Sequence, residues 1–238
     1  MKKYCAGFQV TLLFFFILCA PAFAAQESGS DAATKEAVLV VAFGTSVEKA
    51  RISYANVERQ IKSTRPGADV RWAWTARSLL ATAPKDGSVL SPQEALARLG
   101  TEGVKKVTVL SLHIIPGAEY SGLVKTVEAF QGMPKGIDSL TLCAPLLHDT
   151  QSMGEVADLL LQSLPKERDA KDAVLFVGHG THHPAGVYYP ALQYYLTARD
   201  ARAFVGTVEG DLDVSAVGDS LKKSDIGKVW IAPLMTVA

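Results

Sequence analysis

Short apolar runs separated by helical patterns make up most of this chain. Seven runs are rich in β-branched and other apolar residues, as buried strands are. They cover residues 38–43, 70–74, 107–112, 140–143, 174–179, 204–208 and 229–234. Between them, apolar residues recur at helical spacing, for example Tyr54, Val57 and Ile61. Strands that alternate with helices predict an α/β fold whose sheets are mainly parallel.

Capping residues predict where two of the helices begin. Ser91-Pro92-Gln93-Glu94 is a capping box with proline at the first helical position, so we expect a helix from there through Leu99. Ser46 follows the first strand and is expected to cap the helix that contains Tyr54. Both helices fit the alternation of strands and helices.

The sequence contains an internal echo. Residues 38–45, Val-Leu-Val-Val-Ala-Phe-Gly-Thr, align without gaps on residues 174–181, Val-Leu-Phe-Val-Gly-His-Gly-Thr. More faintly, residues 111–116 parallel residues 233–238. The echo predicts two similar halves, each a mainly parallel sheet flanked by helices, which face each other across a cleft. The alternative is that apolar strands ending in Gly-Thr resemble each other by chance.

The first residues have the pattern of a secretory signal peptide. Two lysines precede an apolar run, and Ala22-Phe23-Ala24 is a small-x-small cleavage site. A membrane anchor is the alternative, but the apolar run is short for a bilayer span. A lipoprotein anchored through Cys19 would need a small residue where Leu18 stands. We therefore expect export to the periplasm, with cleavage after Ala24 and no membrane span in the mature chain.

These patterns divide the chain into four expected segments. They are a signal peptide at 1–24, a flexible polar tail at 25–35, an N-terminal α/β half at 36–145 and a C-terminal α/β half at 146–238. Cleavage removes two lysines from a chain with 24 basic and 24 acidic residues, so the mature protein has no basic excess for binding nucleic acid. The sequence leaves open whether the chain forms a homo-oligomer.

The stretch around His179 is the strongest candidate for chemistry. Ligands of open α/β sheets bind at the carboxyl ends of strands, and His179 ends an apolar run between Gly178 and Gly180. His182 and His183 follow at once. Each of these histidines also has a structural alternative, as a hydrogen-bonded or solvated loop residue.

Carboxylates and one more histidine follow other strands. Glu209 comes directly after the strand at 204–208, and His113 and Glu119 follow the strand at 107–112. For Glu209 the alternative is a simple loop charge. Imidazole and carboxylate without thiolate suit a first-row divalent ion such as Co²⁺, Fe²⁺, Ni²⁺ or Zn²⁺. The sequence has no P-loop, no dinucleotide-binding glycine motif and no nucleophile elbow.

At these residues the chain resembles the class II tetrapyrrole chelatases, most closely the anaerobic sirohydrochlorin cobaltochelatases of the CbiK type. The matching stretches are 40–46, 111–120, 144–147, 178–183, 206–209 and 233–235, in family order. The resemblance implies insertion of Co²⁺, with Fe²⁺ as an alternative ion, into sirohydrochlorin, a flat, carboxylate-rich macrocycle of the cobalamin pathway. It assigns His179 and Glu209 to the metal site and to catalysis. We expect the macrocycle to contact Phe43, Gly44, Thr45, His113, Glu119, His182 and His183.

Two departures from the family pattern leave other functions open. In the family, a Gly-Asp-His segment that supplies another metal-site histidine follows the motif at 233–235, whereas this sequence ends at Ala238. A chain that ends there is expected to be weakly active or inactive. The signal peptide is the second departure, because sirohydrochlorin is a cytoplasmic intermediate. It favours a periplasmic protein that binds haem, another tetrapyrrole or a metal without turnover. A zinc hydrolase using His179 and Glu209 is the third alternative.

Overall fold

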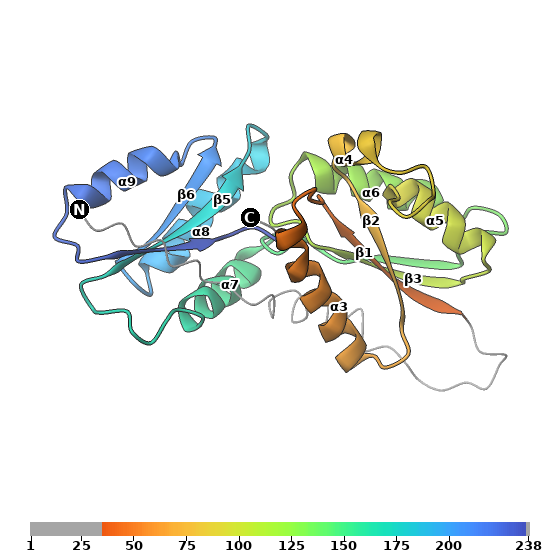
Figure 1. The fold of residues 1–238 in the computed structure, drawn as a ribbon, viewed down its shortest axis with the longest axis horizontal. Helices are drawn as coiled ribbons and strands as arrows, with labels where there is room; N and C mark the ends of the chain where they lie inside the picture. Colours follow the sequence, from red (N-terminus) through yellow and green to blue (C-terminus); the bar gives the residue numbers. More distant parts are fainter. Residues whose placement is uncertain (1–34, 237–238) are drawn as a thin grey trace. The chain divides into compact units, whose positions relative to one another are not determined.

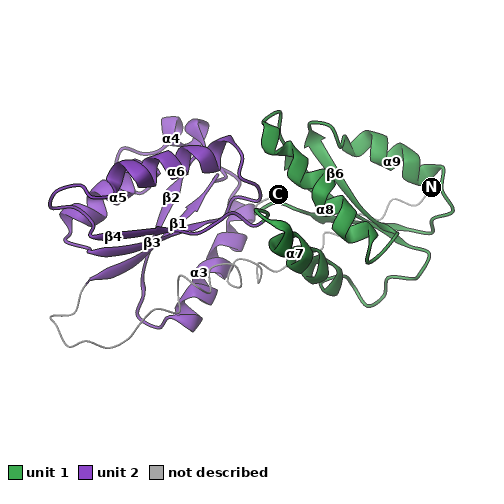
Figure 2. Cartoon of the chain, turned by 180° about the vertical axis from the view of Figure 1, so that it is seen from behind, with its two compact units in different colours: residues 1–14, 147–236, 238 green, residues 15–146, 237 purple. Residues whose placement is uncertain are grey.

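The computed structural model describes residues 35–236 and divides them into two compact units (Figure 1, Figure 2). The N-terminal unit ends at Leu146 and the C-terminal unit begins at Leu147. The predicted signal peptide and all but the last residue of the predicted tail lie outside the described residues. Between residues 35 and 236, no helix has the length and apolar character needed to cross a membrane.

A four-stranded parallel sheet forms the centre of the N-terminal unit. Its strands are β1 (Glu36–Ala42), β2 (Asp69–Trp74), β3 (Lys106–Ser111) and β4 (Ser139–Leu142), in the order β2-β1-β3-β4. The helices are η1 (Glu48–Arg51), α3 (Ile52–Thr64), α4 (Arg77–Thr82), α5 (Pro92–Thr101) and α6 (Ala118–Phe130). Because all neighbouring strands are parallel, their carboxyl ends meet at one edge of the sheet.

The register assigns α3 to one face of this sheet and α5 and α6 to the other. Val41 of β1 and its partner Ala73 of β2 belong to the core that contains the buried residues of α5 and α6. Trp72 and Trp74, on either side of Ala73, point to the opposite face, where their rings contact Tyr54 of α3. Both faces of the sheet are therefore covered, as the continuous apolar character of β1 predicts.

A three-stranded parallel sheet forms the centre of the C-terminal unit. Its strands are β5 (Ala173–Gly180), β6 (Ala203–Glu209) and β7 (Val229–Pro233), in the order β6-β5-β7. The helices are α7 (Thr150–Gln162), η2 (Pro184–Val187), α8 (Tyr188–Thr197) and α9 (Val214–Lys222). On the outer side of β6, the side chain of Gln193 accepts the N–H of Val205 and donates to the carbonyl oxygen of Ala203. The side chain of Gln193 thus occupies two backbone groups of β6 that a further strand would bind.

The two units repeat one topology. In each, the first strand lies at the centre, the second strand on one side and the third strand on the other. Leu112 donates its backbone N–H to the carbonyl oxygen of Val41 (2.8 Å), and Leu234 donates to Val177 (2.7 Å). These are matched positions of the two sequence echoes. The predicted α/β class, with two similar halves built on parallel sheets, is confirmed.

Local details differ in how well the sequence predicts them. The capping box is confirmed, because Ser91 Oγ accepts the N–H of Glu94 and the Glu94 carboxylate accepts the N–H of Ser91. The expectation that Ser46 caps the next helix is wrong: Val47 is the N-cap, and the 3₁₀ turn η1 precedes α3. Helix α4 is not predicted, because six residues are too few to show a helical period.

Candidate functional site

An imidazole and a carboxylate lie at the carboxyl edge of the C-terminal sheet. His179 lies near the end of β5, and Glu209 is the last residue of β6. The register pairs Glu209 with Gly180, the residue after His179. Both side chains are exposed. Parallel pairing of β5 with β6 therefore brings two of the predicted metal-site residues to neighbouring strand ends.

Glycines allow β5 to be packed closely at this edge. A Cβ atom on Gly180 would lie 1.8 Å from the carbonyl oxygen of Glu209, and the φ angle of Gly180 is +81°, a value that favours glycine. A Cβ atom on Gly178 would lie 2.4 Å from the ring of Tyr189. Helix α8 therefore packs directly on the backbone of β5, and β6 approaches the same backbone from the side.

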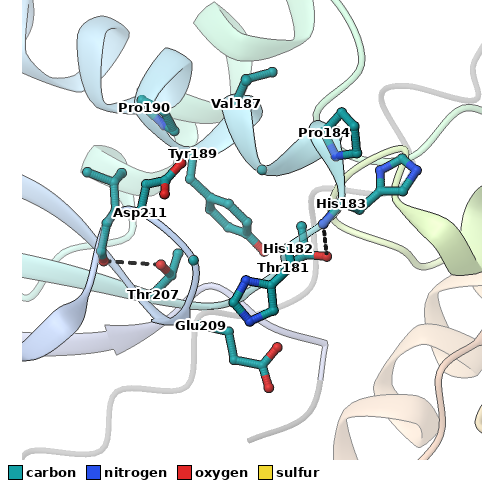
Figure 3. Close-up of a pocket in the computed structure, with 13 residues that line it drawn as sticks. Thr181, His182, His183, Pro184, Val187, Tyr189, Pro190, Thr207, Glu209 and Asp211 are labelled. Atoms are coloured by element: carbon teal, nitrogen blue, oxygen red, sulfur yellow. Dashed lines mark hydrogen bonds between the residues drawn. The ribbon is translucent and has the colours of Figure 1, made fainter.

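A cavity of about 220 Å³ lies beside these strand ends (Figure 3). Its lining includes Thr181, His182, His183, Tyr189, Thr207, Glu209 and Asp211. The structure thus brings together three of the predicted site residues, His182, His183 and Glu209. His179, the third predicted histidine of this stretch, is not among the residues that line the cavity.

Hydrogen bonds assign the tautomers of two histidines. Nδ1 of His183 accepts the backbone N–H of Ala185 (3.1 Å), so the neutral ring carries its proton on Nε2. Nδ1 of His179 lies 3.4 Å from the carbonyl oxygen of Gly180, a contact that places the proton on Nδ1. The lone pair on Nε2 of His179 is then available to a metal ion or a proton. His183 caps η2, whereas His179 is free to act as a ligand.

Two carboxylates make the C-terminal cavity attractive to cations. Glu209 and Asp211 both line it, and neither side-chain carboxylate forms a hydrogen bond or an ion pair within the described residues. Carboxylates beside neutral imidazoles suit a divalent first-row ion. In the part of the chain that the structure describes, no three His, Cys, Asp or Glu side chains lie close enough together to form a complete metal site.

His113 follows β3 in the N-terminal unit and is held in its neutral form. Its Nδ1 lies 2.8 Å from Oγ of Ser111, and its Nε2 lies 3.4 Å from Oγ1 of Thr75. The ring of Tyr120 stands edge-on to the imidazole, with 6.3 Å between ring centroids. Burial lowers the pKa of His113 to about 4. The ring is therefore uncharged at neutral pH.

The other expected substrate contacts of the N-terminal unit follow β1 and β3. The side chain of Phe43 is 49% exposed, and Gly44 has a φ angle of +101°. Thr45 Oγ1 accepts the backbone N–H of Val47 and so holds the turn after β1. Glu119 is exposed in the first turn of α6. These residues all lie on segments that leave the carboxyl edge of the sheet.

Among the residues that line the C-terminal cavity and that sequence reasoning missed, four carry a hydroxyl or carboxylate group. They are Thr181, Tyr189, Thr207 and Asp211. Three of them lie within two residues of His179 or Glu209, so the strand-end rule points to their neighbourhood. Tyr189 is different, because it comes from α8 and reaches the site through its packing on Gly178.

Comparisons with known proteins agree on one family. The model of the family described as cobalt chelatase (CbiK) matches residues 36–238. The chain is 36% identical over 208 residues to the sirohydrochlorin cobaltochelatase CbiKC of Nitratidesulfovibrio vulgaris. This alignment covers 86% of this chain and 72% of that relative. It is 33% identical over 207 residues to the sirohydrochlorin cobaltochelatase of Salmonella typhimurium, covering 86% and 77%.

A solved structure shares the fold. The SirB protein from Bacillus subtilis, determined with Fe³⁺, superposes with a TM-score of 0.54 over 84% of this chain and 76% of that chain. The sequence identity is 15%, so this likeness concerns the fold alone.

Replacing His113 with glutamine is expected to flatten the pH dependence of stability. The pKa of about 4 in the folded state lies below the ordinary value of 6.5, so the unfolded chain binds more protons between these pH values. The stability that the neutral ring contributes is full above pH 6.5 and is lost as the pH falls towards 4. Urea unfolding at several pH values measures this slope, with His182→Gln as a control at an exposed histidine. Equal slopes for His113→Gln and wild type would contradict the expectation.

Gly180→Ala is expected to lower the free energy of unfolding by at least about 2 kcal/mol, because the new Cβ meets the backbone of Glu209 and the positive φ disfavours alanine. Gly218→Ala is the matched control. Gly218 lies inside α9, and an added Cβ there meets nothing within 4 Å, so this change is expected to stabilise by roughly 1 kcal/mol. Denaturant unfolding of both variants tests the contrast, and a Gly180→Ala protein as stable as wild type would refute it.

Proposed function

Because the chain belongs to the cobalt chelatase (CbiK) family, we propose that it inserts Co²⁺ into sirohydrochlorin. The observation that carries this proposal is the identity of 36% and 33%, each over 86% of the chain, to two sirohydrochlorin cobaltochelatases. Co²⁺ and the macrocycle are both substrates of the reaction. The protein has to bind each of them and release the metallated product.

The chemistry of insertion requires a cation site and a proton acceptor. Two pyrrole N–H protons leave the macrocycle, and one dipositive ion takes their place among the four nitrogen atoms. Glu209, whose carboxylate has no partner among the described residues, supplies negative charge that attracts Co²⁺. His179, whose Nδ1 contacts the carbonyl oxygen of Gly180, offers Nε2 to the ion or to a proton. These roles for His179 and Glu209 are part of the proposal.

Few protein ligands suit an ion that has to be passed on. An ion held by one imidazole and one carboxylate keeps open coordination positions, as catalytic metal sites do. The macrocycle nitrogens can fill these positions one after another while the protein ligands leave. Fe²⁺ has the same charge and similar ligand preferences, so we propose that it is accepted in place of Co²⁺.

The sequence before the first strand favours a second candidate function. Two lysines, an apolar run and Ala22-Phe23-Ala24 are typical of a signal peptide. A periplasmic location would separate the protein from a cytoplasmic substrate. The alternative is therefore a periplasmic carrier that binds haem, another finished metallotetrapyrrole or the metal itself without turnover.

An anaerobic absorbance assay tests the proposed reaction. The chain from Ala25 onward is mixed with sirohydrochlorin and Co²⁺, and the change in the macrocycle spectrum reports insertion. His179→Ala and Glu209→Gln are each expected to slow insertion by at least about 100-fold, because each removes a group that acts on the ion or the proton. Glu167→Gln, at an exposed carboxylate that does not line the cavity, is the control and should keep the wild-type rate.

The outcomes separate the candidates. Fast insertion by wild type with loss in both site variants supports the chelatase and the metal site. Equal rates in wild type and both site variants would refute the roles given to His179 and Glu209. Tight binding of a finished metallotetrapyrrole by a wild-type protein that inserts no metal would favour the carrier.

A further inference from the structure

The N-terminal unit contains a second cavity, of about 400 Å³, which is separate from the C-terminal cavity described above. It lies between α3, α4 and the carboxyl end of β2, elements that are labelled in Figure 1. We call it the tryptophan groove and define it by Thr45, Arg51, Tyr54, Trp72 and Trp74. Trp74 ends β2 and Thr45 follows β1, so one end of the groove lies at the carboxyl edge of the sheet, the usual ligand position of an α/β fold.

The internal duplication makes the groove the counterpart of the C-terminal cavity. The echo matches Thr45, in the groove lining, to Thr181, in the lining of the C-terminal cavity. The strand partners at this position agree as well. Trp74 is the partner of Ala42 in β1, and the echo matches Ala42 to Gly178. Gly178 in turn is the partner of Thr207 in β6. Trp74 and Thr207 line the two cavities. One position of the fold therefore forms a cavity in both units.

A buried tyrosine repeats in the same way. Tyr54 of α3 and Tyr189 of α8 each come from the helical segment that follows the central strand, and each lines its cavity. The two hydroxyl groups approach the backbone of the matched glycines Gly44 and Gly180. The common framework is thus a strand, a Gly-Thr turn and a tyrosine.

The side chains added to this framework differ in charge between the two units. The C-terminal cavity carries two histidines and two carboxylates, which suit a cation. The tryptophan groove has an arginine at its rim and two indole rings in its wall. Arginine binds carboxylates, and indole rings provide flat surfaces for a conjugated ring. The groove therefore suits a planar ligand that carries negative charge.

The indole rings are held in place before any ligand binds. Trp72 and Trp74 stack with 5.4 Å between ring centroids and 16° between planes. Nε1 of Trp72 donates to Oε2 of Glu58 (2.9 Å), and Glu58 also pairs with Lys62. The one acidic side chain that lines the groove is thus paired with Lys62, which offsets its repulsion of an anion.

The hydroxyl group of Tyr54 and the guanidinium of Arg51 could both bind a ligand carboxylate. Tyr54 is 6% exposed, and its hydroxyl group forms no hydrogen bond of standard geometry. Its O–H therefore has no acceptor, and leaving such a group buried is costly. Arg51 is exposed and forms no ion pair within residues 35–236, whereas Arg71 on β2 is paired with Asp69 and Glu102.

We infer that the tryptophan groove binds the carboxylate-bearing rim of the tetrapyrrole substrate. A carboxylate arm pairs with the guanidinium of Arg51 and accepts the hydroxyl proton of Tyr54 in a hydrogen bond, and a pyrrole ring lies against the indoles. A cavity of about 400 Å³ holds one ring with its acid arms rather than four rings. This inference rests on the proposed function, because it takes sirohydrochlorin as the substrate.

Binding of metal-free sirohydrochlorin to the chain from Ala25 onward tests the groove directly. Two of the three tryptophans line it, so quenching of tryptophan fluorescence reports on occupancy. Arg51→Met is expected to weaken binding about tenfold, since it removes a charged hydrogen bond. It should raise KM for sirohydrochlorin by a similar factor and leave kcat unchanged. Arg59→Met, at an exposed arginine of α3 outside the groove, is the control and should bind as wild type does.

Tyr54→Phe supplies a readout that a merely structural tyrosine would not give. Removing an unsatisfied buried hydroxyl should raise the thermal unfolding midpoint of the free protein and weaken macrocycle binding several-fold. A sirohydrochlorin whose carboxylates are methylated should bind wild type about tenfold more weakly, the loss expected for one charged hydrogen bond. The same ester should show no further loss with Arg51→Met, because the interacting charge is already gone.

The remaining outcomes distinguish the proposed role of the groove from the proposed insertion reaction. Equal affinity of wild type, Arg51→Met and Tyr54→Phe would refute the groove while leaving cobalt insertion intact. Binding of benzoate that depends on Arg51 and that the macrocycle does not displace would assign the groove to a small free acid instead. Macrocycle binding that depends on Arg51, with no insertion of Co²⁺, would support the groove and refute the chelatase reaction. A wild-type chain that does not bind sirohydrochlorin would refute both.

Discussion

Parallel pairing around one central strand decides where this protein can carry out chemistry. In each unit the first strand is paired on both sides, and all strands run in the same direction. The hydrogen bonds from Leu112 to Val41 and from Leu234 to Val177 fix the third strand against the first at matched positions. Every segment that follows a strand therefore leaves from one edge, and the candidate residues of both units come from the strands near that edge and from those segments.

The same backbone plan supports opposite electrostatics in the two units. Gly44-Thr45 and Gly180-Thr181 make equivalent turns after the central strands, and a tyrosine packs behind each turn. The C-terminal unit adds imidazoles and carboxylates, whereas the N-terminal unit adds an arginine and indoles. A metal ion and an anionic macrocycle have complementary needs, and a duplicated fold can meet each need with one copy. Function here depends on the side chains placed on the fold, not on the fold itself.

The sequence predicts the architecture better than it predicts the cavities. The strands are recognisable because they are buried on both faces and read as continuous apolar runs, and the echo at Val38 and Val174 predicts the repeat. Strand ends then point to His179 and Glu209. Tyr189 and Tyr54 could not be found in this way, because each reaches its cavity through the packing of a helix on a strand. Tyr189 packs on Gly178 of β5, and Tyr54 packs on Trp72 and Trp74 of β2. The predicted start of the helix after β1 was wrong for a local reason, because a 3₁₀ turn that begins after Val47 precedes α3.

The position of Gln193 restricts how copies of this chain can associate. An unpaired strand edge is a template for another strand, and many proteins aggregate or join through such edges. Here the carboxamide of Gln193 already uses the N–H of Val205 and the carbonyl of Ala203 on the outer side of β6. A second copy would have to displace this side chain before it could extend the sheet there. Continuation of the sheet beyond β6 is therefore not expected in an oligomer of this chain.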